Sequence, residues 1–272
     1  PHWTQRWWHR GLYEDKITMD QAAAAELLLV DTGTSLRICP PELSQRMAFL
    51  PQYYPDMTPS DQTLAERQRS MVERMERLPS DRYIFASGDP SGHRDWETLL
   101  AAVQGESVAL RIFSNGNPVP GCTPVNASAD AALPGQCVYM PRLDRQQYEH
   151  MMENALFVAV PIHTYGKWAA GVTSMTDAMR HGKIVAVTDR QMSLADGLIR
   201  DGYNGFLVAA ANTSHWKQVI SFLASATADM LQNFEQRVFE IARGRLSREA
   251  FVAEFQCTVA SIRAGHPKVT RD

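Results

Sequence analysis

The sequence predicts an α/β protein with a parallel sheet at its core, and three observations carry this prediction. From Pro79 onward, short apolar runs alternate with segments of helical period. The runs are continuously apolar, as in strands covered on both faces, rather than alternately apolar and polar. Strands joined through helices cross over with the right hand. Together these features predict a doubly wound, Rossmann-like domain.

The predicted strands and helices follow one another along this region. Strands are expected at Tyr83–Ser87, Val108–Ser114, Cys137–Met140, Leu156–Pro161, Ile184–Thr188 and Phe206–Val208. Helices are expected at Arg94–Val103, Arg145–Glu153, Val172–His181, Ser193–Arg200 and His215–Ser225. Residues Thr227–Ala264 predict two further helices with a break near Gly244–Ser247. Residues 115–135, rich in Gly, Pro, Asn and Ala, predict a long variable loop.

The first quarter of the chain is polar and punctuated by proline. Trp3, Trp7 and Trp8 lie at helical spacing with arginines between them, and we expect them to pack against a neighbour rather than to lie on a membrane. The apolar stretch Ala22–Val30 precedes a proline-rich, extended connection. Ser60–Leu78 has the capping residues and the period of a polar helix.

The amino-acid composition and the absence of several motifs from the sequence exclude some classes of function. The chain has 27 Lys and Arg against 30 Asp and Glu, a formal charge of −3, so a nucleic-acid partner is not predicted. No apolar run approaches the ~18 residues of a membrane span. No Cys or His spacing matches a zinc site, and neither a Walker lysine motif nor a nucleophile elbow is present. The sequence therefore predicts a soluble enzyme without a metal.

Cysteine usage and the lack of a leader segment bear on location. The four cysteines (Cys39, Cys122, Cys137 and Cys257) are too few for a disulfide scaffold. Cys122 and Cys137 could bridge across one loop, but their usage favours free thiols. No segment has the pattern of a signal peptide. The predicted location is the cytoplasm, with a peripheral position on the inner membrane face as the alternative.

The first candidate site follows the strand at residues 83–87, because ligands of open parallel sheets bind outside the carboxyl ends of the strands. Gly88 and Gly92 let the backbone approach a ligand closely, and Arg94 at the start of the next helix can reach an anion. The alternative is a flexible turn in which Arg94 is solvated, and the segment alone favours neither.

The second candidate site opens the helix predicted at residues 172–181. Gly171, Val172 and Thr173 supply backbone amides at the positive end of the helix dipole, which suits a diphosphate. The hydroxyls of Thr173 and Ser174 supplement them, and Lys167 adds a full positive charge. The alternative is that Thr173 or Ser174 only caps the helix while Lys167 is a surface residue.

Four residues outside these two segments are weaker candidates. Asp177 lies one turn beyond Thr173 on the same helix face, where a carboxylate can accept hydrogen bonds from ribose hydroxyls. Backbone groups of Tyr139 and Met140, at the end of a short strand, could contact the edge of a base. His163 could be a ligand or an acid–base group, but an ordinary polar loop histidine is the favoured interpretation.

Taken together, these segments resemble the donor-binding half of GT-B glycosyltransferases of the large retaining group called family 4. The resemblance covers about residues 60–265. Its last block, Asp201-Gly-Tyr-Asn-Gly205-Phe-Leu-Val208, is a turn that we expect to be structural. The four blocks, in the order that the family has them, are Tyr83–Gly88 with Arg94–Ala101, Glu153–Pro161, Ala170–Asp189 and Asp201–Val208.

The resemblance implies transfer of a sugar from a nucleoside-diphosphate sugar to an acceptor hydroxyl, with retention and without a cofactor or metal. It implies that Arg94 and Lys167 neutralise the leaving diphosphate, that the amides of Gly171–Thr173 hold its oxygens, and that Asp177 holds the ribose. The chain departs from the family pattern at the donor sugar: Ala169 stands where the family has its first glutamate.

The resemblance also implies the domain organisation. Residues 1–59 match the tail of an amino-terminal acceptor domain and a linker, residues 60–265 the donor-binding domain, and residues 266–272 a short tail. We therefore expect a fragment, or the donor half of a split enzyme that needs a missing N-terminal domain or a separate acceptor-binding subunit. The expected ligands are a nucleotide-sugar donor and an unidentified glycan, lipid-linked or small-molecule acceptor.

Two alternatives stay open. A catalytically silent nucleotide-sugar-binding or regulatory module is favoured by Ala169 and by Asp89, which replaces the basic residue often found after the glycine turn. A different GT-B-like enzyme, a sugar-nucleotide epimerase or a phosphorylase, is the other.

Overall fold

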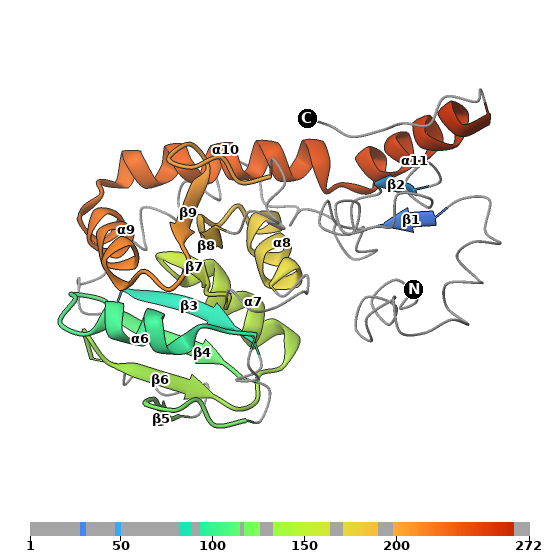
Figure 1. Cartoon of the computed structure of the whole chain (residues 1–272). Coiled ribbons are helices and arrows are strands. Elements are labelled where there is room, and N and C mark those ends of the chain that lie inside the picture. Colours follow the sequence, from blue (N-terminus) through green and yellow to red (C-terminus); the bar gives the residue numbers. More distant parts are fainter. Residues whose placement is uncertain are drawn as a thin grey trace.

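The structure is a computed structural model that describes residues 28–30, 47–49, 82–88, 93–114, 117–125, 133–163, 171–189 and 198–263. Its centre is a seven-stranded sheet in which all paired strands are parallel (Figure 1). The strands are β3 (Tyr83–Ser87), β4 (Ala109–Phe113), β5 (Thr123–Pro124), β6 (Cys137–Met140), β7 (Phe157–Val160), β8 (Val185–Asp189) and β9 (Gly205–Ala209). Their order across the sheet is β5-β6-β4-β3-β7-β8-β9.

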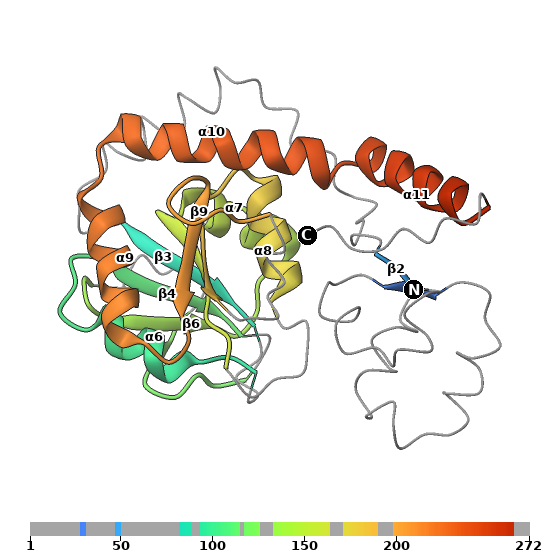
Figure 2. The ribbon, with the colours of Figure 1, turned by 45° about the horizontal axis from the view of Figure 1, so that its top comes forward.

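Helices cover both faces of this sheet. One layer holds α6 (Trp96–Val103) and α9 (Thr213–Ser225), and the other holds α7 (Arg145–Asn154) and α8 (Val172–Arg180). The long helix α10 (Ala228–Arg245) runs past the β9 end of the sheet and contributes buried residues to both layers (Figures 1 and 2). The last helix, α11 (Arg248–Arg263), follows it after a short break.

The central strand β3 is buried on both faces, as its continuously apolar sequence predicts. Ile84 and Ala86 belong to the core under α6 and α9, whereas Tyr83 and Phe85 belong to the core under α7 and α8. All four are at most 3% exposed. Burial of a large apolar side chain contributes about 1.5–3 kcal/mol, so neither face of the strand can carry an uncompensated polar residue.

The predicted fold class is confirmed. β3 and β6 have the predicted bounds, and the other four predicted strands differ by one residue at either end. α6 begins two residues later than predicted because the Asp95 side chain caps it by accepting a hydrogen bond from the Thr98 amide at 3.2 Å. The break between the last two helices falls at Leu246–Ser247, inside the predicted interval.

Three features differ from the prediction or add to it. The region predicted as a loop contains β5, a strand of two residues that pairs with β6. A separate two-stranded parallel sheet joins β1 (Leu28–Val30) to β2 (Met47–Phe49). Residues 198–200 are not helical, and the rest of the helix predicted at Ser193–Arg200 lies outside the described residues, as do the tryptophan-rich start and Ser60–Leu78.

The expectation of free thiols is wrong for Cys122 and Cys137, which form a disulfide. The physical reason is the pairing of β5 with β6, which the sequence did not reveal. It brings the two Cα atoms to 4.7 Å, within the range that a disulfide needs. Cys257, on α11, is exposed and lies outside this disulfide, and Cys39 lies outside the described residues.

The turn at residues 201–205 has the structural role expected of it. The Asn204 side chain accepts a hydrogen bond from the Arg200 amide at 2.6 Å and donates one to the Leu198 carbonyl at 2.7 Å. Gly205 lies against β8, where a Cβ would come within 2.6 Å of the Val185 carbonyl oxygen. Among the described helices, none is both long and apolar enough to span a bilayer.

Candidate functional site

The carboxyl ends of β3, β4, β6 and β7 meet at one edge of the sheet. Ser87 of β3 lies opposite Phe113 of β4, and Phe113 lies opposite Met140 of β6, so these three strands end level with one another. The chain leaves this edge into α6, α7 and α8, whose first turns therefore surround it. This is the place where a parallel sheet offers a ligand site.

Arg94 is fixed at this edge by the backbone on either side of it. The Asp95 amide donates to the Pro161 carbonyl at 3.4 Å, and the His163 amide donates to the His93 carbonyl at 3.1 Å. These two bonds tie the start of α6 to the end of β7. Arg94 therefore enters the site from a backbone that is held on two sides.

Two glycines make room for the Arg94 guanidinium. Both have positive φ, +145° at Gly88 and +93° at Gly171, a conformation that L side chains rarely adopt. A Cβ on Gly88 would overlap Nε of Arg94, and a Cβ on Gly171 would lie 2.7 Å from its Nη1. The sequence predicted all three residues as site residues, and the structure brings them together.

The Arg94 charge is buried without a full set of partners. Nη2 donates to Ser174 Oγ at 3.2 Å, whereas Nη1 is buried and has no hydrogen-bond partner among the described residues. Burial lowers the pKa of Arg94 to about 10, so the side chain is still protonated at neutral pH. A buried guanidinium with an unused donor is suited to an anion, which would supply the missing bonds and counter-charge.

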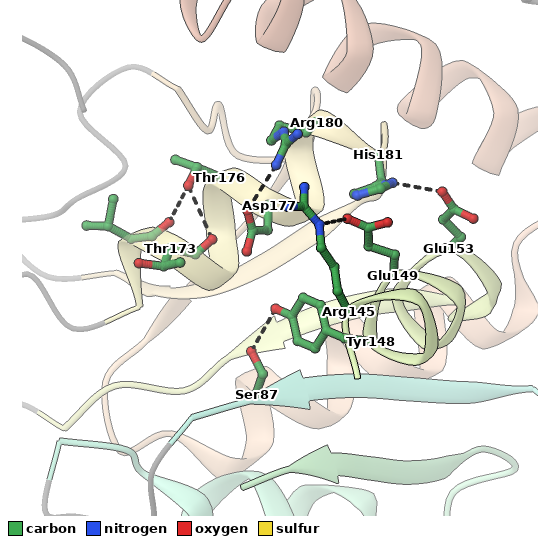
Figure 3. Close-up of polar contacts among 11 residues, drawn as sticks. Ser87, Arg145, Tyr148, Glu149, Glu153, Thr173, Thr176, Asp177, Arg180 and His181 are labelled. Carbon is green, nitrogen blue, oxygen red and sulfur yellow. Dashed lines mark hydrogen bonds and ion pairs between the residues drawn. The ribbon is translucent and has the colours of Figure 1, made fainter. Parts of the chain in front are cut away.

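A chain of hydroxyl groups runs from Arg94 across the site. Ser174 Oγ lies 2.8 Å from Ser87 Oγ. Ser87 Oγ in turn lies 3.3 Å from the Tyr148 hydroxyl (Figure 3). Ser87 and Ser174 are buried. The Ser174 hydroxyl, which we expected to supplement the amides at the start of α8, points inward to Arg94 and Ser87. Sequence analysis missed Tyr148, because it lies on the apolar stripe of α7 together with Met151 and Met152.

The start of α8 has no side-chain cap. Its N-cap residue is Gly171, which has no side chain to accept a hydrogen bond from the first-turn amides. This excludes Thr173 and Ser174 as N-caps. Val172 is buried and Thr173 is exposed. The positive end of the α8 dipole thus opens onto the same edge of the sheet as Arg94.

Asp177 lies one turn further along α8, on the side that faces α7 (Figure 3). Its side chain is 23% exposed, and its Oδ1 lies 3.5 Å from Nη1 of Arg180. Burial raises the pKa of Asp177, and the positive charge of Arg180 opposes this effect in part. On α7, Arg145 pairs with Glu149 at 2.9 Å and extends toward Asp177 (Figure 3).

The carbonyl groups of Tyr139 and Met140, the residues predicted to contact a base, already accept hydrogen bonds from the backbone. The Tyr139 carbonyl accepts a hydrogen bond from the Val125 amide at 2.9 Å, and the Met140 carbonyl accepts one from the Ser114 amide at 3.3 Å. The first of these bonds exists because the unpredicted strand β5 pairs with β6.

The structure gives less information on the other predicted site residues. Lys167, Ala169 and Asp89 lie outside the described residues, so the role expected for Lys167 stays a prediction. Nδ1 of His163 lies 4.0 Å from the Asp95 carboxylate at the rim of the site. In the part of the chain that the structure describes, no group of three or more His, Cys, Asp or Glu side chains is placed to hold a metal ion.

Comparisons with known proteins give structural relatives only. No protein-family model matches the chain, and no curated protein matches it by sequence. HepE of Anabaena, solved with UDP and glucose, superposes with a TM-score of 0.62 at 14% identity, over 94% of this chain and 68% of that one. WaaG, a glycosyltransferase of lipopolysaccharide biosynthesis, gives 0.58 at 14% identity, over 94% and 69%.

Sucrose-phosphate synthase of Thermosynechococcus elongatus gives a TM-score of 0.62 at 16% identity, over 92% of this chain and 63% of that one. TarM gives 0.63 at 14% identity, over 90% of this chain but 45% of that one. At these identities the likeness establishes the fold, which agrees with the parallel seven-stranded sheet and its two helical layers. The chain therefore has the α/β, Rossmann-like fold of the GT-B glycosyltransferases.

Proposed function

We propose that the edge of the sheet around Arg94 binds a nucleoside-diphosphate sugar, and that the complete protein transfers the sugar to an acceptor hydroxyl. The observation that carries the proposal is the buried Arg94 guanidinium, which lies between Gly88 and Gly171 beside the uncapped start of α8. A full positive charge and a helix N-terminus converge there, and both attract an anion such as a diphosphate.

The remaining described residues fit the rest of a nucleotide. We propose that Asp177, one turn along α8, accepts hydrogen bonds from ribose hydroxyls, and that the chain just beyond β6 contacts the base. UDP is the nucleotide that we test first, because HepE was solved with UDP and with UDP-glucose. Lys167 is proposed as a second cation at the diphosphate.

In the proposed reaction, the bond between the anomeric carbon and the diphosphate oxygen breaks and its electron pair stays on the diphosphate. The acceptor oxygen bonds to the anomeric carbon, and its proton passes to the released diphosphate or to solvent. Charge therefore develops on the diphosphate, where Arg94 and the α8 dipole can stabilise it without reorganising. The protein thus supplies the positive charge for which other enzymes use a metal ion. Retention of configuration follows from the family resemblance.

A second candidate function is a silent nucleotide-binding module. Ala169 and Asp89 favour it, since both remove side chains through which the family meets its donor. In addition, the chain spans 45% to 69% of the structures HepE, WaaG, sucrose-phosphate synthase and TarM. In the transferase, we propose that a further domain or a partner subunit supplies the acceptor part of the active site.

A thermal-shift panel of UDP, GDP and ADP without added metal tests the shared part of both candidates. A ligand at 100 times its Kd stabilises the folded state by about 2.7 kcal/mol, which is easily measured. A selective shift with one diphosphate supports the donor site. No shift with any of them contradicts it. Slow release of free glucose from UDP-glucose, followed by NMR, then favours the transferase over the silent module.

A further inference from the structure

Tyr148 is held rigidly at the edge of the site. It lies on the first turn of α7, which begins with a capping box: the Asp144 carboxylate accepts from the Gln147 amide at 2.8 Å, and the Gln147 side chain accepts from the Asp144 amide at 3.0 Å. Its ring packs edge-on against the rings of Phe85 and Phe113, with centroids at 5.5 and 5.6 Å. Packing alone would be satisfied by a phenylalanine.

The hydroxyl of Tyr148 ends the chain of hydrogen bonds that Arg94 begins. Arginine can only donate, so Ser174 Oγ accepts from Arg94, and its own hydrogen can go to Ser87 Oγ at 2.8 Å or to the Ser87 carbonyl at 3.5 Å. The shorter contact is the one to Ser87 Oγ. When Ser174 donates to Ser87 Oγ, the Ser87 hydrogen is left for the Tyr148 oxygen, 3.3 Å away. In this arrangement every hydroxyl of the chain donates in the same direction, and the Tyr148 hydrogen points onward, away from Ser87.

Both charged side chains of the proposed nucleotide site are near enough to Tyr148 to act on it. The charges of Arg94 and of Asp177 both act on its hydroxyl, and Asp177 of α8 faces Tyr148 of α7 across the site (Figure 3). Burial raises the pKa of Tyr148 to about 12, so the hydroxyl stays a hydrogen-bond donor at every physiological pH.

We propose that the Tyr148 hydroxyl donates a hydrogen bond to the phosphate attached to the ribose. This proposal rests on the proposed function, in which Arg94 and the start of α8 hold the diphosphate and Asp177 holds the ribose. In such a complex, the phosphate that joins those two parts of the ligand would lie between Arg94 and Asp177, and both of these charged side chains act on the Tyr148 hydroxyl. In this arrangement Ser87 and Ser174 act as positioning residues, since Ser87 occupies the Tyr148 oxygen and leaves the Tyr148 hydrogen for the phosphate.

The test is Tyr148→Phe, which keeps the ring and removes the hydroxyl. Its affinities for UDP, UMP and uridine are compared with those of the wild-type chain by ligand-observed NMR and calorimetry. The matched control is Tyr83→Phe on the same face of the sheet, where the hydroxyl donates to the Met151 carbonyl at 2.8 Å, away from the site. The thermal stability of both variants is measured without ligand.

A hydrogen bond to a charged phosphate predicts about a tenfold or greater loss for Tyr148→Phe, equal for UDP and UMP, with uridine unchanged. Tyr83→Phe is expected to bind UDP as the wild type does. UDP and UMP affinities within twofold of wild type in Tyr148→Phe would overturn this inference alone. An equal loss for uridine would also overturn it, because the hydroxyl would then serve the nucleoside. Absence of UDP binding by the wild-type chain would overturn the proposed function with it.

Discussion

Replacing Arg94 by methionine should make the empty protein more stable and its nucleotide complex less stable. The guanidinium is buried between two glycines with one hydrogen-bonded nitrogen, Nη2, and one buried nitrogen without a partner, Nη1. Its pKa falls from the ordinary 12.5 to about 10 because burial disfavours the charged form. The folded protein therefore binds this proton less tightly than the unfolded chain does.

The magnitude follows from that difference. Each unit of pKa corresponds to about 1.4 kcal/mol, so burying the cation costs roughly 3 kcal/mol at every pH well below 10. Methionine keeps the apolar stem but loses the bond to Ser174, which contributes about 1 kcal/mol. The net gain expected for Arg94→Met without ligand is about 1–2 kcal/mol, a rise in Tm of roughly 2–8 °C for a domain of this size.

Differential scanning calorimetry with and without UDP is the assay. Saturating UDP should raise the Tm of the wild type strongly and that of Arg94→Met little, so the order of the two proteins reverses. The control is Arg111→Met, since Arg111 stacks on the Tyr83 ring at 4.1 Å on the neighbouring strand and should leave the UDP shift unchanged. A lower Tm for empty Arg94→Met, or an unchanged UDP shift, would refute the reasoning.

Two predictions concern the end of α8 that lies away from the site. The Lys183 side chain is 2% exposed, and its ammonium lies 2.6 Å from the Glu235 carboxylate. Lys183→Met should therefore lower the free energy of unfolding by about 3 kcal/mol, because it leaves the carboxylate unpaired, whereas Lys183→Met combined with Glu235→Leu should regain most of that loss. Equal urea midpoints for the single and double variants would contradict this. The His181 hydrogen bond at 2.8 Å lowers the pKa of Glu153, so the stability that this pair adds is present above the unfolded pKa and is lost as pH falls through the folded one. Glu153→Gln should therefore be less stable than wild type by up to about 1 kcal/mol at pH 7 and equal to it in strong acid, and a constant difference in denaturation experiments across that range would exclude the linkage.

The parts of the fold that follow from periodicity could be predicted from the sequence. Strands such as Tyr83–Ser87 are apolar on both faces, and single residues such as Asp95 determine where the helices begin and end. The two-residue strand Thr123–Pro124 could not, because a segment this short has no period. Without it, the contact between Cys122 and Cys137 could not be anticipated either.

The candidate site was predictable to the level of its elements. The order of strand and helix placed Gly88, Arg94 and Gly171 at one edge of the sheet before any contact was known. Tyr148 was hidden because its position on the apolar stripe of α7 is what a core aromatic would also occupy. Which atoms of a half-buried side chain meet polar partners depends on packing between elements far apart in the chain, and no local pattern records it.

The central claim is that a nucleoside diphosphate binds where α6 and α8 begin. Hydrogen exchange of the chain with and without saturating UDP, read by mass spectrometry, tests it most directly. Slower exchange in peptides that cover Gly171–Thr176 and His93–Thr98, with α9 unchanged, is the predicted result. Bound UDP that leaves both peptides unprotected would contradict the account.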